Sequence, residues 1–297
     1  MTLMSRWLFH SLLTMVFWGI WGFIPSKLGQ ISAEQQQILS TLGLLPIIIV
    51  LACARQRLHG TRIKRGCIVA LVGGLVGSVG NLLFLRLLSV EQNATTVVPL
   101  TSLYPMVTVV LAVVLLREKL NGVQLAGIGL ALVSIYFFNP TSQNPWSMRW
   151  LGFAVLPMGC WAVAALLQKL CTNDVSAELS TLCFLLAQMP ISLLLLFSHS
   201  LNWQLTPHDW SWGAALGLFL GLGNLTCLAA FSAGGKAAIV SPLVGVYSLV
   251  TVLLAVTWGG EKVSLRHGLA IGLALLAVIA LALETPAAAE QDAPVRS

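Results

Sequence analysis

The sequence predicts an all-α integral membrane protein with ten transmembrane helices, arranged as two inverted five-helix repeats. Its composition and its internal repetition support this fold class. Of the 297 residues, 57% are hydrophobic and only 9% are charged. A soluble globular protein carries roughly a quarter charged residues, so this chain could not cover its surface in water. The lipid bilayer is therefore the expected solvent.

Ten apolar stretches are long enough to cross a bilayer, which requires about 20 mostly apolar residues. The first follows Arg6, contains Trp18, Trp21 and Pro25, and precedes nine more stretches. We therefore interpret it as a retained helix and not as a cleaved signal peptide. The expected spans are 7–27, 36–54, 67–89, 94–116, 121–139, 148–168, 177–199, 210–233, 236–258 and 265–284.

The distribution of lysine and arginine predicts the orientation, because these residues are enriched in cytoplasmic loops. With the N-terminus in the cytoplasm, eleven of the 16 basic residues fall on that side and four on the other, while Arg86 lies near a helix end. The loop at 55–66 alone contributes five of them. We therefore expect both termini in the cytoplasm.

The chain repeats itself at a spacing of 143 residues, and polar and aromatic residues stay in register. Shared apolar composition alone would not keep Asn, Pro, Tyr and Glu at matching positions. The matched pairs include Trp18 and Trp161, Asn81 and Asn224, Pro99 and Pro242, Tyr104 and Tyr247, and Glu118 and Glu261.

Each repeat contains five expected spans, at residues 1–140 and 141–284, and a tail at 285–297 that is rich in Ala, Pro and acidic residues is expected to be disordered. Because five is an odd number, the second copy enters the membrane from the opposite side. Such inverted repeats underlie alternating access in many secondary transporters, with the substrate site between the repeats near the midplane.

The duplicated stretches Ala94–Phe137 and Ala237–Ala280 carry a family resemblance. Each has a proline early in the fourth helix of its repeat, a Glu-Lys pair at the end of that helix, and a glycine-containing fifth helix. On these features the chain resembles the drug/metabolite transporter superfamily, and within it the EamA-type ten-helix transporters. The resemblance implies small-solute transport through a cavity lined by helices 1, 3, 4, 6, 8 and 9.

The repeat and the resemblance together predict a secondary transporter of a small metabolite, with amino acids among the candidates and export favoured by the resemblance. The expected location is the cytoplasmic (inner) membrane of a prokaryotic cell. The expected partners are a small-molecule substrate and the lipid bilayer, without nucleic acid, and the oligomeric state is left open. The alternatives are a drug or nucleotide-sugar carrier of the same fold and a membrane enzyme or assembly protein without transport activity.

Seven side chains inside the expected spans are candidates for substrate binding. A polar group in lipid is costly unless it is paired or faces a wet path, and deep tryptophans could wall a cavity. The structural alternatives are packing for the tyrosines, hydrogen bonds between helices for the asparagines, and bulk in the bundle core for the tryptophans. The candidates are Trp18, Trp21, Asn81, Tyr104, Trp161, Asn224 and Tyr247.

Four residues are candidates for hinges or gates. Pro99 and Pro242 interrupt the backbone hydrogen bonds early in spans 4 and 9, which either frees a hinge or simply shapes the helix. Glu118 and Glu261 close the same two spans at opposite faces of the membrane, where they are either gates or solvated helix ends.

Several classes of chemistry have no signal in the sequence. All ten acidic residues fall in loops, at helix ends or in the tail, which disfavours proton-coupled export of a cation and favours a neutral or zwitterionic substrate. No phosphate-binding loop or catalytic cluster is present, so we expect no enzyme, no cofactor and no metal. The six cysteines lack ligand spacing and are interpreted as small core residues.

Overall fold

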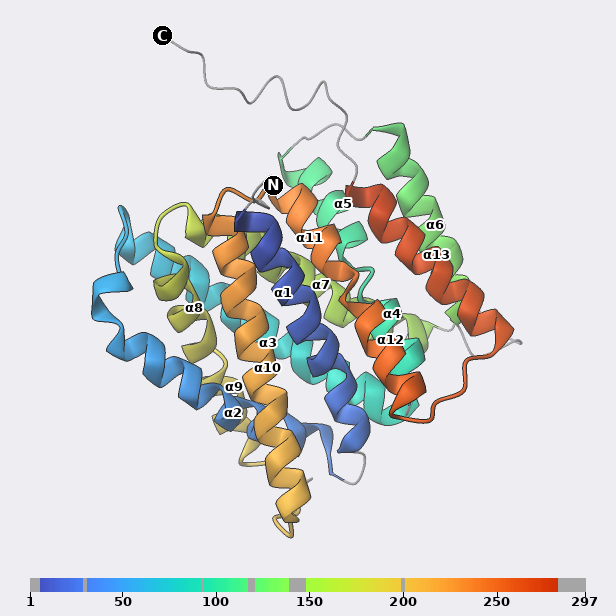
Figure 1. Ribbon diagram of the computed structural model, residues 1–297, viewed down its shortest axis with the longest axis horizontal. Coiled ribbons are helices and arrows are strands. Elements are labelled where there is room, and N and C mark those ends of the chain that lie inside the picture. Colours follow the sequence, from blue (N-terminus) through green and yellow to red (C-terminus); the bar gives the residue numbers. More distant parts are fainter. Residues whose placement is uncertain are drawn as a thin grey trace, which may run out of the picture.

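The computed structural model is a bundle of helices, shown in Figure 1, and it describes residues 6–28, 31–91, 93–116, 121–138, 148–198 and 201–282. In these ranges the only β-type pairing is an isolated bridge between Gly60 and Val175. The expected all-helical class is therefore confirmed for this part of the chain. The tail expected at 285–297 lies outside the described residues.

The first half of the chain provides six α-helices and two short 3-10 helices. The expected fourth span, 94–116, is divided into two helices. The elements are α1 (Arg6–Phe23), η1 (Ile24–Lys27), α2 (Ala33–Cys53), η2 (Arg55–Arg57), α3 (Ile63–Glu91), α4 (Ala94–Thr101), α5 (Tyr104–Leu116) and α6 (Gly122–Phe138).

The second half repeats this order, and its ninth span is divided at the corresponding place. Its seventh span is also divided. The elements are α7 (Met148–Thr172), α8 (Ala177–Leu186), α9 (Met189–Leu195), α10 (Pro207–Ser232), α11 (Ala237–Gly245), α12 (Tyr247–Thr257) and α13 (Leu265–Ala282).

Seven stretches in the described residues are long and apolar enough to cross a membrane, and two shorter apolar helices accompany them. The shorter ones are Gly122–Phe138 and Leu265–Leu281. The seven are Arg6–Lys27, Ala33–Cys53, Ile63–Glu91, Phe153–Thr172, Ala177–Leu195, Pro207–Ser232 and Val240–Thr257.

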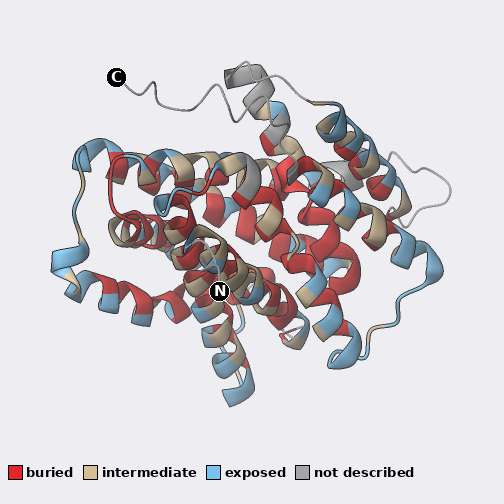
Figure 2. Cartoon of the chain, turned by 45° about the horizontal axis from the view of Figure 1, so that its top comes forward, coloured by how far each residue is buried: buried red, intermediate tan, exposed pale blue. Residues whose placement is uncertain are grey.

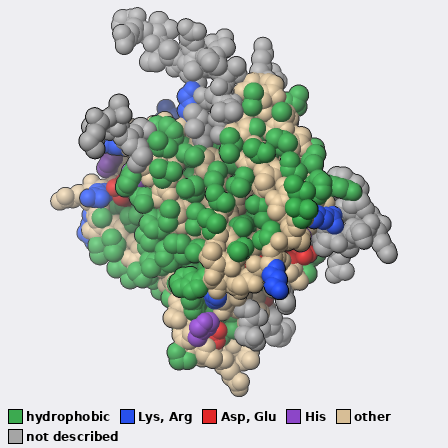
Figure 3. All heavy atoms as spheres, turned by 45° about the vertical axis from the view of Figure 1, so that its right-hand side comes forward, with side chains coloured by type: hydrophobic (Ala, Val, Ile, Leu, Met, Phe, Trp, Pro, Cys, Tyr) green, Lys and Arg blue, Asp and Glu red, His purple; other side chains and the backbone are tan. Residues whose placement is uncertain are grey.

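The outer surface of the bundle is apolar, as expected for contact with lipid. One broad face of the molecule is dominated by hydrophobic side chains, with few charged side chains among them (Figure 3). Large apolar residues such as Phe197 and Leu265 are more than 80% exposed. Buried residues gather where helices face one another (Figure 2). The core is therefore the set of interfaces between helices, and the outer faces are available to acyl chains.

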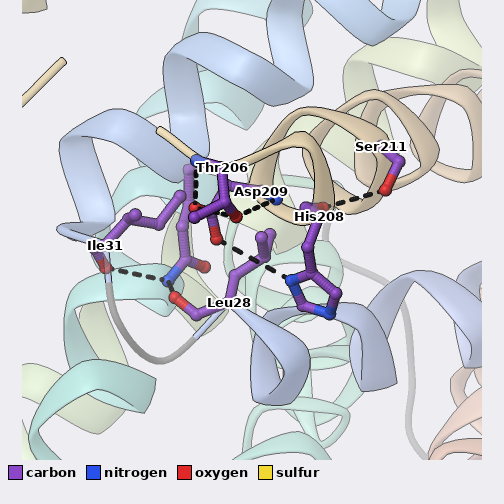
Figure 4. A network of polar contacts seen from close by, with 7 residues as sticks. Leu28, Ile31, Thr206, His208, Asp209 and Ser211 are labelled. Carbon is purple, nitrogen blue, oxygen red and sulfur yellow. Dashed lines mark hydrogen bonds and ion pairs between the residues drawn. The ribbon is translucent and has the colours of Figure 1, made fainter. Parts of the chain in front are cut away.

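Capping side chains begin two of the helices that enter the bundle at the same end. Ser32 and Gln35 form a reciprocal capping box at the start of α2, and Thr206 and Asp209 form one at the start of α10. These side chains satisfy backbone N–H groups that have no partner inside the helix. Figure 4 shows the second box beside the turn at Leu28. Local sequence therefore fixes where each of the two helices begins.

The contacts between helices come in pairs that the 143-residue spacing relates. α1 packs on α10 and α12, and its counterpart α7 packs on α3 and α5. Similarly, α10 packs on α2, and α3 packs on α8. α6 and α13, which correspond to each other, pack together. The duplicated sequence is thus matched by a duplicated set of helix interfaces.

The two divided helices cross each other head to tail. The first part of one, α4, contacts the second part of the other, α12, while α5 contacts α11. The divisions do not fall at the expected prolines, because Pro99 lies inside α4 and Pro242 inside α11. Helix α4 ends at Thr101, and the nearby Pro105 provides no N–H for the carbonyl group of Thr101.

Glycines allow α2 and α10 to approach closely. A Cβ atom added at Gly217 would clash with the carbonyl oxygen of Ser40, and one added at Gly43 would clash with the backbone of Ala214. Gly213 and Gly221 face side chains of α2 in the same row. The small-residue pattern in α10 therefore serves helix packing, as its sequence indicates.

We expect Gly217→Ala to lower the free energy of unfolding by about 1–3 kcal/mol, because overpacking a tight contact forces backbone shifts. Thermal unfolding in detergent would measure this loss as a lower melting temperature. Gly129→Ala is the matched control, since a Cβ atom added there meets no atom within 4 Å. Equal melting temperatures for the two variants would contradict the close packing of α2 and α10.

Candidate binding cavity

One cavity in the centre of the bundle brings together all seven residues predicted to bind substrate. Its volume is about 60 Å³, well below the roughly 300–1,000 Å³ of typical small-molecule sites, so the centre of the bundle is nearly closed in this conformation. The lining residues are Trp18, Trp21, Gly77, Asn81, Tyr104, Trp161, Ala164, Ala165, Gln168, Phe184, Leu220, Asn224 and Tyr247.

The first Trp–Tyr–Asn set has all three side chains in hydrogen bonds. The indole Nε1 of Trp161 donates to Oδ1 of Asn81 at 3.0 Å, and Asn81 Nδ2 donates to Oε1 of Gln188 at 3.4 Å. The hydroxyl of Tyr104 donates to the carbonyl oxygen of Ser241 at 3.4 Å. The rings of Tyr104 and Trp161 meet edge to face, with centroids 6.3 Å apart. This set joins α3, α5, α7 and α11.

The second set has the same rings but a different hydrogen bond. Trp18 and Tyr247 also meet edge to face, with centroids 6.2 Å apart. However, Oδ1 of Asn224 accepts from Nε2 of Gln168 at 2.9 Å, and Asn224 Nδ2 donates to the carbonyl oxygen of Leu220 at 2.8 Å. The repeat therefore preserves the aromatic geometry and not the polar pairing.

Two hydrogen-bond donors of the second set differ from their counterparts in the first set. Nε1 of Trp18 and the hydroxyl of Tyr247 are buried and have no hydrogen bond of ordinary geometry. The hydroxyl of Thr101 is the polar neighbour of Tyr247; it donates to the carbonyl oxygen of Val97 at 2.8 Å and, as a hydroxyl, can still accept from Tyr247. Unpaired buried donors are rare in proteins and call for an explanation.

A glycine beside each tryptophan makes room for its indole. A Cβ atom added at Gly80 would lie 2.9 Å from Nε1 of Trp161, and one added at Gly223 would clash with the indole of Trp18. These two glycines are 143 residues apart, like the two tryptophans. In each duplicated Gly-Asn pair, the glycine therefore leaves space for an indole ring and the asparagine places an amide group beside it.

Trp21 closes one side of the cavity within an aromatic cluster. It stacks on Phe84 with ring centroids 5.0 Å apart and meets Trp161 edge to face at 5.8 Å. Trp21 and Phe84 are both buried. Offset and edge-to-face arrangements of this kind stabilise aromatic clusters, so this wall of the cavity is apolar and firm.

The cavity wall is uncharged. None of the described residues that line it is an Asp, Glu, His, Lys or Arg, and the amides of Asn81, Asn224 and Gln168 are among its most polar groups. The six described acidic residues lie in first turns, at helix ends or in loops, as the sequence predicted for them. In the described residues no group of three His, Cys, Asp or Glu could hold a metal ion.

Glu261, a predicted gate, joins the two divided helices at one end of the bundle. Its carboxylate accepts from the backbone N–H groups of Ala94 at 3.2 Å and Thr95 at 2.9 Å, at the start of α4. A carboxylate is favourable at a helix N-terminus. Its counterpart, Glu118, lies outside the described residues.

The end of the first helix reinforces this contact. Nζ of Lys27 donates to the carbonyl oxygen of Trp258 at 3.1 Å and lies over the ring of Phe23, which stacks on Trp258. Helices from both halves of the chain are thus held together at the end where Glu261 lies.

Sequence reasoning missed Gln168 and the apolar lining residues. Gln168 matches Pro25 at the repeat spacing, so the duplication did not mark it. Its position as an amide inside an apolar span was the available signal. Phe184 and Ala164 resemble any other apolar residue of a span, and only the structure places them at the cavity.

Comparisons with known proteins agree with this architecture. The model of the EamA-like transporter family matches the chain twice, over residues 5–139 and 148–283. One solved structure, described only as the crystal structure of a protein, is similar with 18% identity and a TM-score of 0.70, over 98% of this chain and 99% of the other. At that identity the likeness concerns the fold alone. A search of the curated proteins found no match.

A double-mutant cycle would measure the hydrogen bond between Trp161 and Asn81. We expect Trp161→Phe and Asn81→Ala to be coupled by about 1 kcal/mol in the free energy of unfolding, because each removes one side of the same buried bond. The control is the repeat-related cycle of Trp18→Phe and Asn224→Ala, for which we expect coupling close to zero. Equal coupling in both cycles would contradict the asymmetry of the cavity.

Proposed function

The chain belongs to the EamA-like transporter family, and on that premise we propose that it is a secondary transporter that exports a small metabolite by alternating access. The central cavity is the proposed substrate site, and the observation that carries this proposal is the convergence of both repeats on it. Side chains from α1, α3, α5, α7, α10 and α12 meet there. Family members are membrane transporters, so no enzymatic step is invoked.

We further propose ten transmembrane spans in two inverted repeats, at residues 1–140 and 141–284. The paired helix contacts and the head-to-tail crossing of the divided helices support this arrangement. Seven spans are already evident from length and hydropathy. The remaining three would be α4 with α5, α6 and α13. An inverted pair has two similar packings, and exchange between them exposes the central site to each side in turn.

In the proposed orientation both termini are cytoplasmic and the end with Glu261 faces outward. The excess of lysine and arginine on the opposite side supports this orientation, as does the basic loop near η2. The location is then the cytoplasmic membrane. Pro99 and Pro242, within the crossing helices, remain the proposed hinges, with Glu261 and Glu118 as the proposed gates.

The uncharged wall favours a neutral or zwitterionic solute. A charged group moved into a site without a counter-ion loses its hydration without compensation. Amino acids stay among the candidates, because the broken helices can offer backbone dipoles to a zwitterion. A nucleotide sugar is disfavoured, since Arg86, the basic residue nearest to a span interior in sequence, pairs with Glu34 at 2.7 Å.

Transport by the purified protein in liposomes tests the function. We expect saturable uptake of at least one compound from a panel of radiolabelled amino acids and neutral metabolites, measured with and without a pH gradient. Trp18→Ala should lower uptake at limiting substrate about tenfold, which corresponds to about 1.4 kcal/mol of lost binding.

Trp203→Ala is the matched control, because Trp203 is 52% exposed and lies outside the cavity. Uptake that falls equally in both variants would separate transport from the central cavity. Absence of flux for every compound, in folded protein, would contradict the proposed function.

A second experiment tests Glu261 as a gate. We expect Glu261→Ala to raise the labelling rate of a Val98→Cys probe by an impermeant thiol reagent about tenfold, because removal of the carboxylate costs the closed end about 1–2 kcal/mol of capping and charge–dipole stabilisation. Val98 is fully buried behind this end. The measurement uses right-side-out vesicles and a protein in which the six native cysteines are replaced.

Glu34→Ala is the control for the gate. Glu34 lies in the first turn of α2 and pairs with Arg86 of α3, and both helices belong to the first repeat. Faster labelling in both variants would indicate general loosening, and unchanged labelling in Glu261→Ala would show that this carboxylate does not hold the end closed.

A further inference from the structure

The two halves of the cavity differ in their polar contacts, although their aromatic side chains are arranged alike. In the first half, the indole N–H of Trp161 is held by Asn81 at 3.0 Å. In the second half, the corresponding asparagine is engaged by Gln168 at 2.9 Å, and the indole N–H of Trp18 is buried without an acceptor. The cavity therefore contains a donor that the protein itself does not satisfy.

Gln168 is the residue that separates the two halves. It is 4% exposed, lines the cavity, and stands where the first repeat has Pro25, which has no amide to offer. Asn224 is also held by the carbonyl oxygen of Leu220, so both ends of its amide are occupied. Asn224 is thus bonded to Gln168 and Leu220 and makes no hydrogen bond to Trp18.

We propose that the cavity selects neutral solutes that carry a hydrogen-bond acceptor beside an apolar or aromatic body, and that the indole N–H of Trp18 binds this acceptor. This inference rests on the proposed function and names the substrate class of the same cavity. A bound acceptor, such as an amide or ketone carbonyl oxygen, would satisfy a donor that is costly to leave unpaired.

The surroundings define the rest of the solute. The cluster of Trp21, Phe84 and Trp161 provides aromatic faces and edges for a planar or apolar body. No cation lines the described part of the cavity, so a carboxylate or phosphate would lose its hydration without a partner. A carbonyl compound fits these conditions, and its carboxylate analogue does not.

Three matched probes test the substrate class: phenylacetamide, phenylacetate and 2-phenylethylamine, each measured by equilibrium dialysis against the purified full-length protein at neutral pH. The first has a neutral carbonyl acceptor, while the second is an anion and the third a cation without an acceptor. We expect phenylacetamide to bind at least about tenfold more tightly than the other two. Equal or tighter binding of phenylacetate would overturn the proposal, as would absence of phenylacetamide binding to folded protein.

Two substitutions test the residues. Trp18→Phe keeps an aromatic ring without the N–H, and we expect it to weaken phenylacetamide binding about tenfold. Trp203→Phe is the control, because Trp203 is 52% exposed and lies outside the cavity, and its affinity should stay within about twofold. An unchanged affinity in Trp18→Phe would overturn the role of Trp18, and far-UV circular dichroism would verify that each variant is folded.

Gln168→Leu tests the origin of the free donor. It releases Oδ1 of Asn224 to accept from Trp18, so we expect phenylacetamide binding to fall as in Trp18→Phe, with no further loss when both substitutions are combined. Additive losses, or wild-type affinity in Gln168→Leu, would overturn the role of Gln168. Binding and transport fail separately: flux in liposomes without amide binding would reject the substrate class alone, and amide binding without flux would reject the transporter alone.

Discussion

Polar groups in the hydrocarbon core of a bilayer must find hydrogen-bond partners inside the protein, and the rest of this structure depends on that constraint. Hydroxyl groups within α1 and α2 return to the carbonyl oxygens four residues earlier, as Thr14 does to His10 and Thr41 to Gln37. Other hydroxyl groups bond to a neighbouring helix, as Thr251 of α12 does to the carbonyl oxygen of Gly19 in α1 at 2.7 Å. The interfaces that result are those that the duplication specifies.

The duplication explains why these solutions occur twice. A glycine that seats an indole, followed by an asparagine, appears in both α3 and α10. The contact between α1 and α10 corresponds to the contact between α7 and α3. A side chain that packs well at one of these contacts therefore also packs well at the other. The central cavity lies between the two repeats, and the residues that form its walls are also residues that pack the helices together.

The sequence was sufficient for the helical class and for the seven cavity residues, since polar or aromatic side chains that stay in register inside apolar spans carry a signal in themselves. It was insufficient for the divisions in spans 4 and 9. Pro99 and Pro242 were the duplicated prolines, but the helices continue through them, and the first division lies beside Pro105, which has no counterpart in the second repeat. Tertiary contacts decide where such helices bend, and periodicity does not report them.

Gln168 is a residue of the cavity that the sequence repeat likewise did not predict. A search for duplicated residues finds what the two halves share, and it passes over a residue that occurs in one half alone. A fully symmetric cavity would pair both indoles with both asparagines and leave no donor for a ligand. Here Gln168 bonds to Asn224, and the indole N–H of Trp18 is left without an acceptor at the centre of the bundle. The shared residues thus build the cavity, and in the proposed substrate class a single unshared amide makes it selective.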